Sequence, residues 1–146
     1  MTAAVLLMRV TVGALFVWAG AAKIGHADVF AAQLAAFGLV PRALIGPMAL
    51  LLPYVEVLLG AYLVLGLYTR VAAVIAVIQL VIFASAIGSA VARGLSLSCG
   101  CFGPADSTKT SWPEVVRDVA FAGVAAFVAW RSPGMLALDS RIGNVK

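Results

Sequence analysis

Apolar residues gather into four long runs, and most polar residues fall between them. The runs extend over residues 3–22, 48–68, 71–92 and 115–130. A membrane-spanning helix needs about 20 mostly apolar residues to cross about 30 Å of hydrocarbon. The first three runs reach that length, while the fourth is shorter and carries Arg117 and Asp118 near its start. Because the runs are continuous rather than alternating, they predict helices and not the strands of a barrel.

The connections between the runs differ in length. The second and third runs are joined by an expected tight turn at Thr69–Arg70. Residues 23–47 contain a short amphipathic stretch, Phe30–Gly38, that suits a helix lying at the membrane interface. Residues 93–113 contain both cysteines. We therefore predict one all-α domain, an integral membrane four-helix bundle with a short interfacial helix in the first extracytoplasmic loop, and chemistry on the side of the two long connections.

Composition supports a membrane protein. The 146 residues are 64% hydrophobic and 11% charged, with a mean hydropathy of +1.10. Soluble domains have about 45–50% apolar and about 25% charged residues. This excess of apolar residues excludes both a water-soluble globule and a disordered chain. The net charge of +4 comes from ten Lys and Arg scattered singly, which indicates a lipid bilayer as the partner and no nucleic acid.

Glycines are the candidates for close helix packing. Gly13, Gly20 and Gly60 lie within apolar runs, where small residues let helices approach closely within a bundle or in a homodimer. Ala19–Ala21 fits the cleavage pattern of a secretory signal. However, Arg9 interrupts the first run and no Lys or Arg precedes it, so we expect a retained span. The Lys and Arg count is equal on the two sides of the predicted bundle, so charge does not decide its orientation.

The segment Cys99–Gly100–Cys101 is the strongest chemical signal. Gly100 relieves the steric limits on closing a small ring. A disulfide between two cysteines this close is expected to be strained, and strained, exposed bridges are the labile or catalytic ones. The pair is therefore a candidate electron-exchange site. The alternatives are that the cysteines are structural residues or that they bind a metal. Two thiolates and His26, the one obvious further soft ligand, do not fill a four-ligand zinc site. Copper(I) is more suitable because it accepts two thiolates.

Charged residues inside the predicted spans need an explanation. An ionisable group in lipid costs at least about 2.5–3.5 kcal/mol on insertion scales and usually finds a partner within the bundle. Glu56 has three options: it pairs with Arg9, it pairs with Lys23, or it stays protonated. In a functional interpretation, Glu56 and Asp118 handle the protons that a dithiol releases when it is oxidised.

A membrane quinone suits this chemistry, because it takes up two electrons and two protons together. Tyr54 and Phe102 offer aromatic surface for a quinone ring, although aromatic residues near interfaces commonly form the aromatic belt. Arg9 and Lys23 complete this candidate cofactor site. No metal is predicted.

The chain resembles the DoxX-like, methylamine-utilisation MauE family of small four-span membrane proteins over nearly its whole length. The most specific matching motif is Cys99–Gly103, followed by Arg117–Asp118 at the entry to the last run. The weaker matches are Arg9 with Gly13 and Phe16, Gly20–Lys23, and Pro53–Glu56 with Gly60. The resemblance implies a membrane component of an extracytoplasmic thiol-redox pathway that works beside thioredoxin-like proteins.

These observations predict a membrane thiol–disulfide redox protein. It would pass electrons between an extracytoplasmic thioredoxin-like partner and a membrane quinone, with Cys99 and Cys101 as the redox pair. Dithiols that serve secreted clients face an oxidising compartment, so we expect both termini in the cytoplasm and the cysteine loop outside the cell membrane. The alternative is a non-enzymatic membrane subunit, or a carrier of a soft metal or small solute, whose cysteines bind metal or close a loop.

Overall fold

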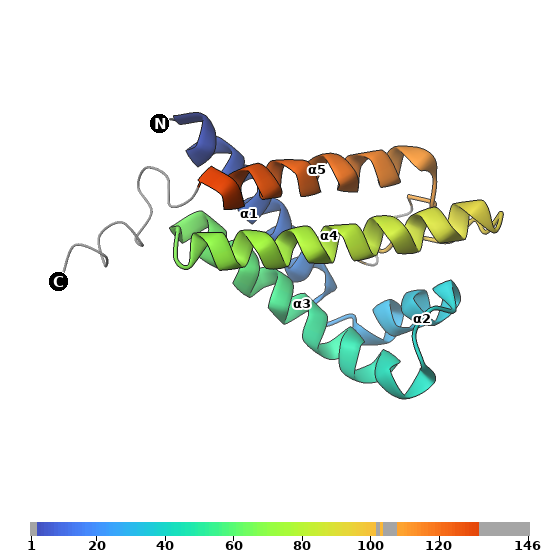
Figure 1. Cartoon of the computed structure of the whole chain (residues 1–146). Coiled ribbons are helices and arrows are strands. Elements are labelled where there is room, and N and C mark those ends of the chain that lie inside the picture. Colours follow the sequence, from blue (N-terminus) through green and yellow to red (C-terminus); the bar gives the residue numbers. More distant parts are fainter. Residues whose placement is uncertain (1–2, 102, 104–107, 132–146) are drawn as a thin grey trace.

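Five α-helices make up the fold (Figure 1). A computed structural model of the chain describes residues 3–101, 103 and 108–131. The helices are α1 (Ala3–Lys23), α2 (Ala27–Phe37), α3 (Arg42–Leu65), α4 (Thr69–Ala92) and α5 (Trp112–Arg131). Within the described residues there is no β-strand, and one isolated bridge joins Ser98 to Lys109. The prediction of an all-α membrane bundle is confirmed.

Three of the helices, α1, α3 and α4, are long and apolar enough to cross a membrane. The protein is therefore a membrane protein with three candidate spans. Helix α5 has 20 residues, close to the length of α1, but Glu114, Arg117, Asp118 and Arg131 make it more polar than the other three. That α5 also crosses the membrane stays a prediction.

Helix α3 differs from the predicted run at both ends. It begins six residues earlier, at Arg42, and continues through Pro47 and Pro53, since spanning helices tolerate proline better than soluble ones. It ends at Leu65 because Gly66 adopts the left-handed conformation, with φ 71°. The turn before α4 therefore covers residues 66–68, and the prediction of a turn at Thr69–Arg70 is wrong.

Glycines bring α1 and α3 into backbone contact, as the sequence predicted. A Cβ atom at Gly13 would lie 2.8 Å from the carbonyl oxygen of Gly60. A Cβ atom at Gly20 would lie 2.5 Å from the carbonyl oxygen of Pro53. Helices α4 and α5 form the second closely packed pair. The core between the pairs includes Phe16.

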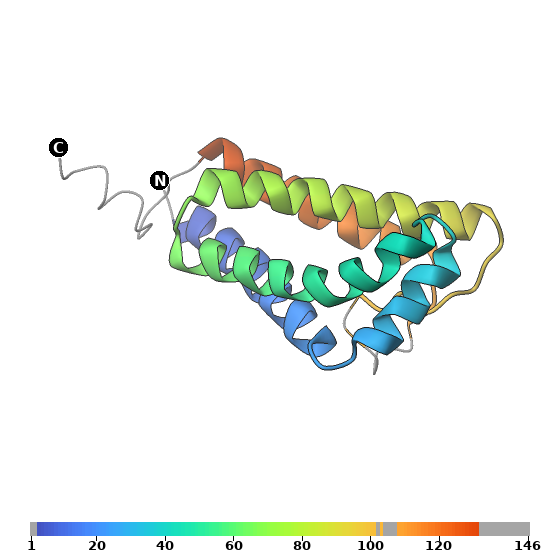
Figure 2. The same cartoon turned by 90° about the horizontal axis from the view of Figure 1, so that it is seen from below.

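The two long connections meet at one end of the bundle. Figures 1 and 2 show α2 and the chain between α4 and α5 at this end, whereas the start of α1, the α3–α4 turn and the end of α5 lie at the other. A separate apolar cluster of Phe37, Ile87, Ala90 and Cys99 fills the interior there. The bundle thus places the cysteines beside α2, far from the start of the chain.

Candidate functional site

The two cysteines form a disulfide packed against α2 and α4. Their Cα atoms are 5.2 Å apart, and Cys99 is buried against Phe37 and Ile87. Gly100 has a φ of 62°, in the left-handed region, and a Cβ atom there would collide with the side chain of Gln33. The backbone conformation therefore favours glycine at this position, and any other residue would also displace the end of the Gln33 side chain.

Backbone pairing holds the strand-like segments on either side of the disulfide together. The Cys99 N–H donates to the carbonyl of Thr108 at 2.9 Å, and the Thr110 N–H donates to the carbonyl of Leu97 at 2.8 Å. The buried Thr110 hydroxyl also donates to the carbonyl of Leu95 at 2.9 Å. These bonds anchor the cysteine segment to the chain that leads into α5.

Two further contacts attach this region to the helices around it. A Cβ atom at Gly103, whose φ is 92°, would lie 2.6 Å from the carbonyl oxygen of Ala22, so the loop lies directly on the end of α1. Arg93, the C-cap of α4, donates through Nη2 to the carbonyl of Phe37 at 2.7 Å. The ends of α1, α2 and α4 therefore support the disulfide together.

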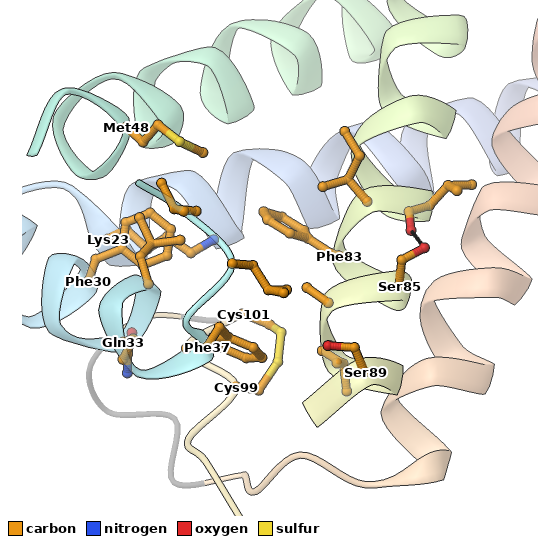
Figure 3. A pocket seen from close by; sticks show the side chains of 18 residues that line it. Lys23, Phe30, Gln33, Phe37, Met48, Phe83, Ser85, Ser89, Cys99 and Cys101 are labelled. Atoms are coloured by element: carbon orange, nitrogen blue, oxygen red, sulfur yellow. Dashed lines mark hydrogen bonds between the residues drawn. A yellow bond between two sulfur atoms is a disulfide. The ribbon is translucent and has the colours of Figure 1, made fainter. Parts of the chain in front are cut away.

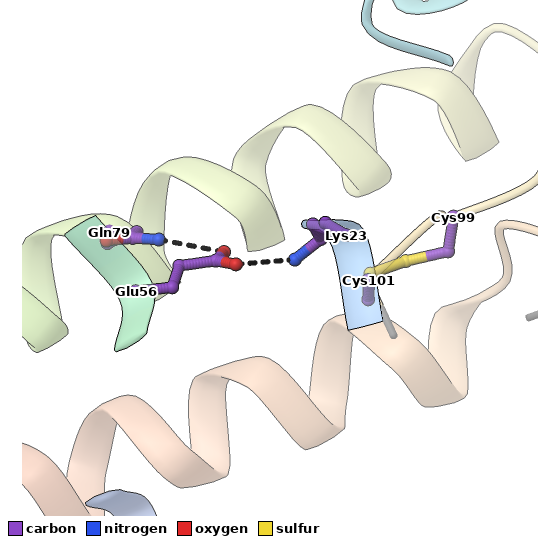
Figure 4. A network of polar contacts seen from close by, with 5 residues as sticks. All are labelled: Lys23, Glu56, Gln79, Cys99 and Cys101. Carbon is purple, nitrogen blue, oxygen red and sulfur yellow. Dashed lines mark hydrogen bonds and ion pairs between the residues drawn. A yellow bond between two sulfur atoms is a disulfide. The ribbon is translucent and has the colours of Figure 1, made fainter. Parts of the chain in front are cut away.

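A buried polar network runs from α4 through α3 to α1 (Figure 4). Lys23 Nζ lies 2.7 Å from Glu56 Oε2, and each side chain is 2% exposed. Gln79 Nε2 donates to Glu56 Oε1 at 3.0 Å. Of the options that the sequence left open for Glu56, the structure shows the pair with Lys23. Figure 4 shows Lys23 between Glu56 and the disulfide.

Aromatic rings surround the Lys23 ammonium group on other sides. The Lys23 Nζ atom lies 5.4 Å from the centroid of the Phe30 ring, on α2, and 5.9 Å from that of Phe83, on α4. Both distances fall within the range of cation–π attraction. The charge is thus held by one carboxylate and two ring faces from three different helices.

An apolar cavity of about 520 Å³ lies between α2, the start of α3 and α4, and the disulfide forms part of its wall (Figure 3). The rings of Phe30, Phe37 and Phe83 line it. Its polar lining side chains are Lys23, Gln33, Ser85 and Ser89. The cavity has the size and mainly apolar lining of a small-molecule site, with a few polar groups to orient a ligand.

A smaller cavity of about 30 Å³ lies beside Cys101. Cys101, Glu56 and Asp118 line it together, so the structure brings together three of the four residues predicted to be catalytic. Asp118 is buried and pairs with Arg117 at 3.0 Å. The volume is sufficient for a water molecule, which can connect the carboxylates with the sulfur.

Of the other predicted site residues, Arg9 and Tyr54 lie elsewhere. Arg9 is buried in α1, 14 residues or about 21 Å of helix before Lys23, and lines neither of these cavities. Tyr54 is 49% exposed on α3 and also lies outside both. Phe102 falls outside the described residues. In the part of the chain that the structure describes, no three His, Cys, Asp or Glu side chains come together as a metal site.

Sequence reasoning missed Phe30, Gln33, Gln79 and Phe83. Gln79 carried a usable signal, because it is the one amide in an otherwise apolar third run. Gln33 likewise interrupts an apolar stretch. Phe30 and Phe83 carried none, since phenylalanine is an ordinary residue in apolar helices.

Comparison with known proteins gives one family. A family model described as "Methylamine utilisation protein MauE" matches residues 1–131. The methylamine utilization protein MauE of Paracoccus denitrificans is 32% identical over 127 residues, which are 86% of this chain and 68% of that protein. Its namesake in Methylorubrum extorquens is 36% identical over 112 residues, 76% of this chain and 60% of that protein.

The MauE protein of Methylophilus methylotrophus is 31% identical over 109 residues, 73% of this chain and 57% of that protein. The aligned part therefore spans between 57% and 68% of these relatives' lengths. No solved structure shows significant similarity to the chain.

Proposed function

The chain belongs to the MauE family, and we propose that it is a membrane thiol–disulfide redox protein that passes electrons between a thioredoxin-like partner and a membrane quinone. We also propose that it serves methylamine utilisation, the process for which its relatives are named. One observation carries the redox proposal. The Cys99–Cys101 disulfide lies in the wall of an apolar cavity, next to a buried Lys23–Glu56 ion pair.

The proposed chemistry has two balanced half-reactions. A thiolate of the reduced partner attacks one sulfur of the bridge and forms a mixed disulfide, which the partner's second thiolate then cleaves. The partner leaves with a disulfide, and Cys99 and Cys101 become thiols. The two thiols then lose two electrons and two protons to a quinone, which re-forms the bridge and releases a quinol. Electron flow towards the partner is the same sequence in reverse.

Charged residues near the bridge have matching roles in this proposal. A positive charge stabilises a thiolate, and Lys23 provides one in the wall of the cavity that Cys101 also lines. Glu56 and Asp118 share the smaller cavity with Cys101. They are placed to accept the protons that leave the thiols, either directly or through a water molecule.

The proposal places the cysteine end of the bundle on the oxidising side of the cell membrane, because exchange with a secreted or periplasmic partner requires it. Two structural features are compatible with this arrangement, although neither selects a side of the membrane. The start of α1 and the end of α5 lie at the same end, opposite the disulfide. Both long connections, which offer surface for a partner, lie at the disulfide end.

The test is the redox state of Cys99 and Cys101 in purified membranes, measured by differential alkylation and mass shift. After reduction, the pair should be re-oxidised when ubiquinone-1 is added and not in its absence. Cys99→Ser and Cys101→Ser should each abolish re-oxidation, whereas Ser96→Ala, a change at an exposed residue of the same segment, should not. Thiols that ignore quinone, or that react only after a chelator is added, would favour the metal or scaffold alternative.

A further inference from the structure

The rim of the large cavity lies on the outer surface of a membrane-spanning helix. Val81 and Ile82, in the middle of α4, line the cavity and are 49% and 59% exposed. Leu39, between α2 and α3, adds an apolar side chain that is 52% exposed. At the depth of a spanning helix, exposed apolar side chains face acyl chains. The cavity therefore opens towards the bilayer, and a ligand dissolved in lipid can enter it.

The inner wall differs from the rim. It contains the disulfide and the Lys23 ammonium group, and the rings of Phe30, Phe37 and Phe83 also line the cavity (Figure 3). An ammonium has three N–H donors, and Glu56 accepts one of them. The wall thus offers a charged hydrogen-bond donor next to a redox-active pair of atoms, inside an otherwise apolar space.

Together these features specify the chemistry of a ligand. It must dissolve in the bilayer, be flat enough to pack between aromatic rings, carry an acceptor oxygen for Lys23, and take electrons from two sulfurs. An acyl chain satisfies the first requirement alone. A quinone with an apolar tail satisfies all four.

We infer that this cavity is the quinone site, with the ring beside the disulfide, one carbonyl oxygen directed at Lys23, and the tail leaving past Val81 and Ile82. The inference rests on the proposed function and deepens it by giving the electron acceptor a location. The volume of about 520 Å³ lies within the range of about 300–1,000 Å³ typical of small-ligand sites. Tyr54, one of the two aromatic residues that the sequence favoured, lies outside this site.

The inference is tested by photolabelling the full chain in lipid nanodiscs with an azidoquinone and mapping the adducts by mass spectrometry. We expect adducts in residues 30–40 and 81–89. Adducts around Tyr54 would overturn the inference. An adduct pattern identical to that of a photoactivatable phospholipid would also overturn it, because it would show that the cavity is a general lipid site.

A matched pair of variants sharpens the test. Ser85→Trp adds bulk at the cavity and should reduce labelling by about tenfold or more, because overpacking removes the space that the ligand needs. Ile78→Trp is the control, since Ile78 is exposed two turns away on the same helix and does not line the cavity. Equal labelling of the two variants would contradict the inference.

The same preparations separate failure of the site from failure of the proposed function. Both variants should melt cooperatively near the temperature of the unmodified chain, which shows that each is folded, and dithiothreitol should reduce the disulfide in both. If Ser85→Trp is still re-oxidised by ubiquinone-1 at the rate of Ile78→Trp, the redox function stands and the site is wrong. If the cavity is labelled in the unmodified chain but ubiquinone-1 never oxidises its thiols, the site stands and the proposed electron acceptor is wrong.

Discussion

Lys23, the last residue of α1, holds its ammonium nitrogen 2.7 Å from Oε2 of Glu56 in the middle of α3, and both side chains are almost completely buried. The pair neutralises two charges that would each be costly in an apolar interior. It also sets the depth of α1 against α3 at the end of the bundle that carries the disulfide.

Removing one partner of this pair should destabilise the protein more than removing both. Glu56→Gln leaves the Lys23 charge without its carboxylate, and the loss of one partner of a buried pair costs about 3–5 kcal/mol. Lys23→Met with Glu56→Leu leaves no unpaired charge, so its cost should be smaller. Chemical unfolding in mixed micelles measures both. The single variants Lys23→Met and Glu56→Leu, compared with their combination, complete a double-mutant cycle. The exposed Arg42→Gln is the control, and additive effects at Lys23 and Glu56 would contradict the expectation.

The close approach of α1 and α3 predicts opposite effects at two glycines. Gly60→Ala should destabilise by about 1–3 kcal/mol, because its Cβ atom would lie 2.5 Å from the carbonyl oxygen of Gly13 and must push the helices apart. Gly123→Ala, on α5, meets no atom within 4 Å and should be neutral or stabilise by up to about 1 kcal/mol through helix propensity. Melting temperatures in detergent compare the two, and a tolerated Gly60→Ala would show that the helices separate readily.

Two separable effects are expected at Gly100. Gly100→Ala introduces a side chain at a φ of 62°, which costs about 1–2 kcal/mol, and also collides with Gln33. Combining Gly100→Ala with Gln33→Ala should remove the collision and leave only the free-energy cost of the left-handed backbone conformation. The fraction of protein that recovers the disulfide after reduction and air oxidation is the measurement. Recovery by Gly100→Ala alone at the level of the double variant would mean that Gln33 moves aside freely.

Stability should depend on pH through the start of α5. Ser111 and Glu114 are hydrogen-bonded through their side chains, and this bond lowers the pKa of Glu114 from its ordinary value of 4.5. A carboxyl group whose pKa is lower in the folded state stabilises the fold above pH 4.5 and loses that contribution as the pH falls through the lowered pKa. The effect should be small, because Glu114 is only partly buried.

Glu114→Gln removes the titrating group at this position and keeps a side chain that can hydrogen-bond. Between pH 5 and pH 3, values that bracket the ordinary pKa of Glu, the melting temperature of this variant should therefore fall less than that of the unmodified chain. Parallel curves for the two proteins would show that Ser111 and Glu114 do not interact in solution.

The helices could be predicted from the sequence because a membrane-spanning helix needs about 20 apolar residues in a row. This pattern can be recognised without knowledge of the fold. That Gly13 and Gly60 lie at helix contacts was predictable for a similar reason, since small residues are where spanning helices meet, but their pairing with each other was not. The start of α3 at Arg42 was missed because Pro47 is a helix breaker in soluble proteins but is tolerated in this helix.

The sequence predicted several residues of the site, but not how the helices arrange them around a cavity. The spacing of Cys99 and Cys101 already indicated a bridge. The choice of Lys23 over Arg9 as the partner of Glu56 depended on how the helices stack, which periodicity does not report. The apolar cavity depends on the position of α2 relative to α4, which the Arg93 side chain fixes through the carbonyl of Phe37. No motif encodes that contact.

Cys101 lines both cavities, the large apolar one and the small one that holds Glu56 and Asp118. The Cys101 residue therefore separates an apolar space from a space lined by acidic side chains. A molecule dissolved in lipid and a water molecule can reach this residue without occupying the same space. In the proposed reaction, the hydrophobic ligand and the protons would therefore take different routes that meet at one residue.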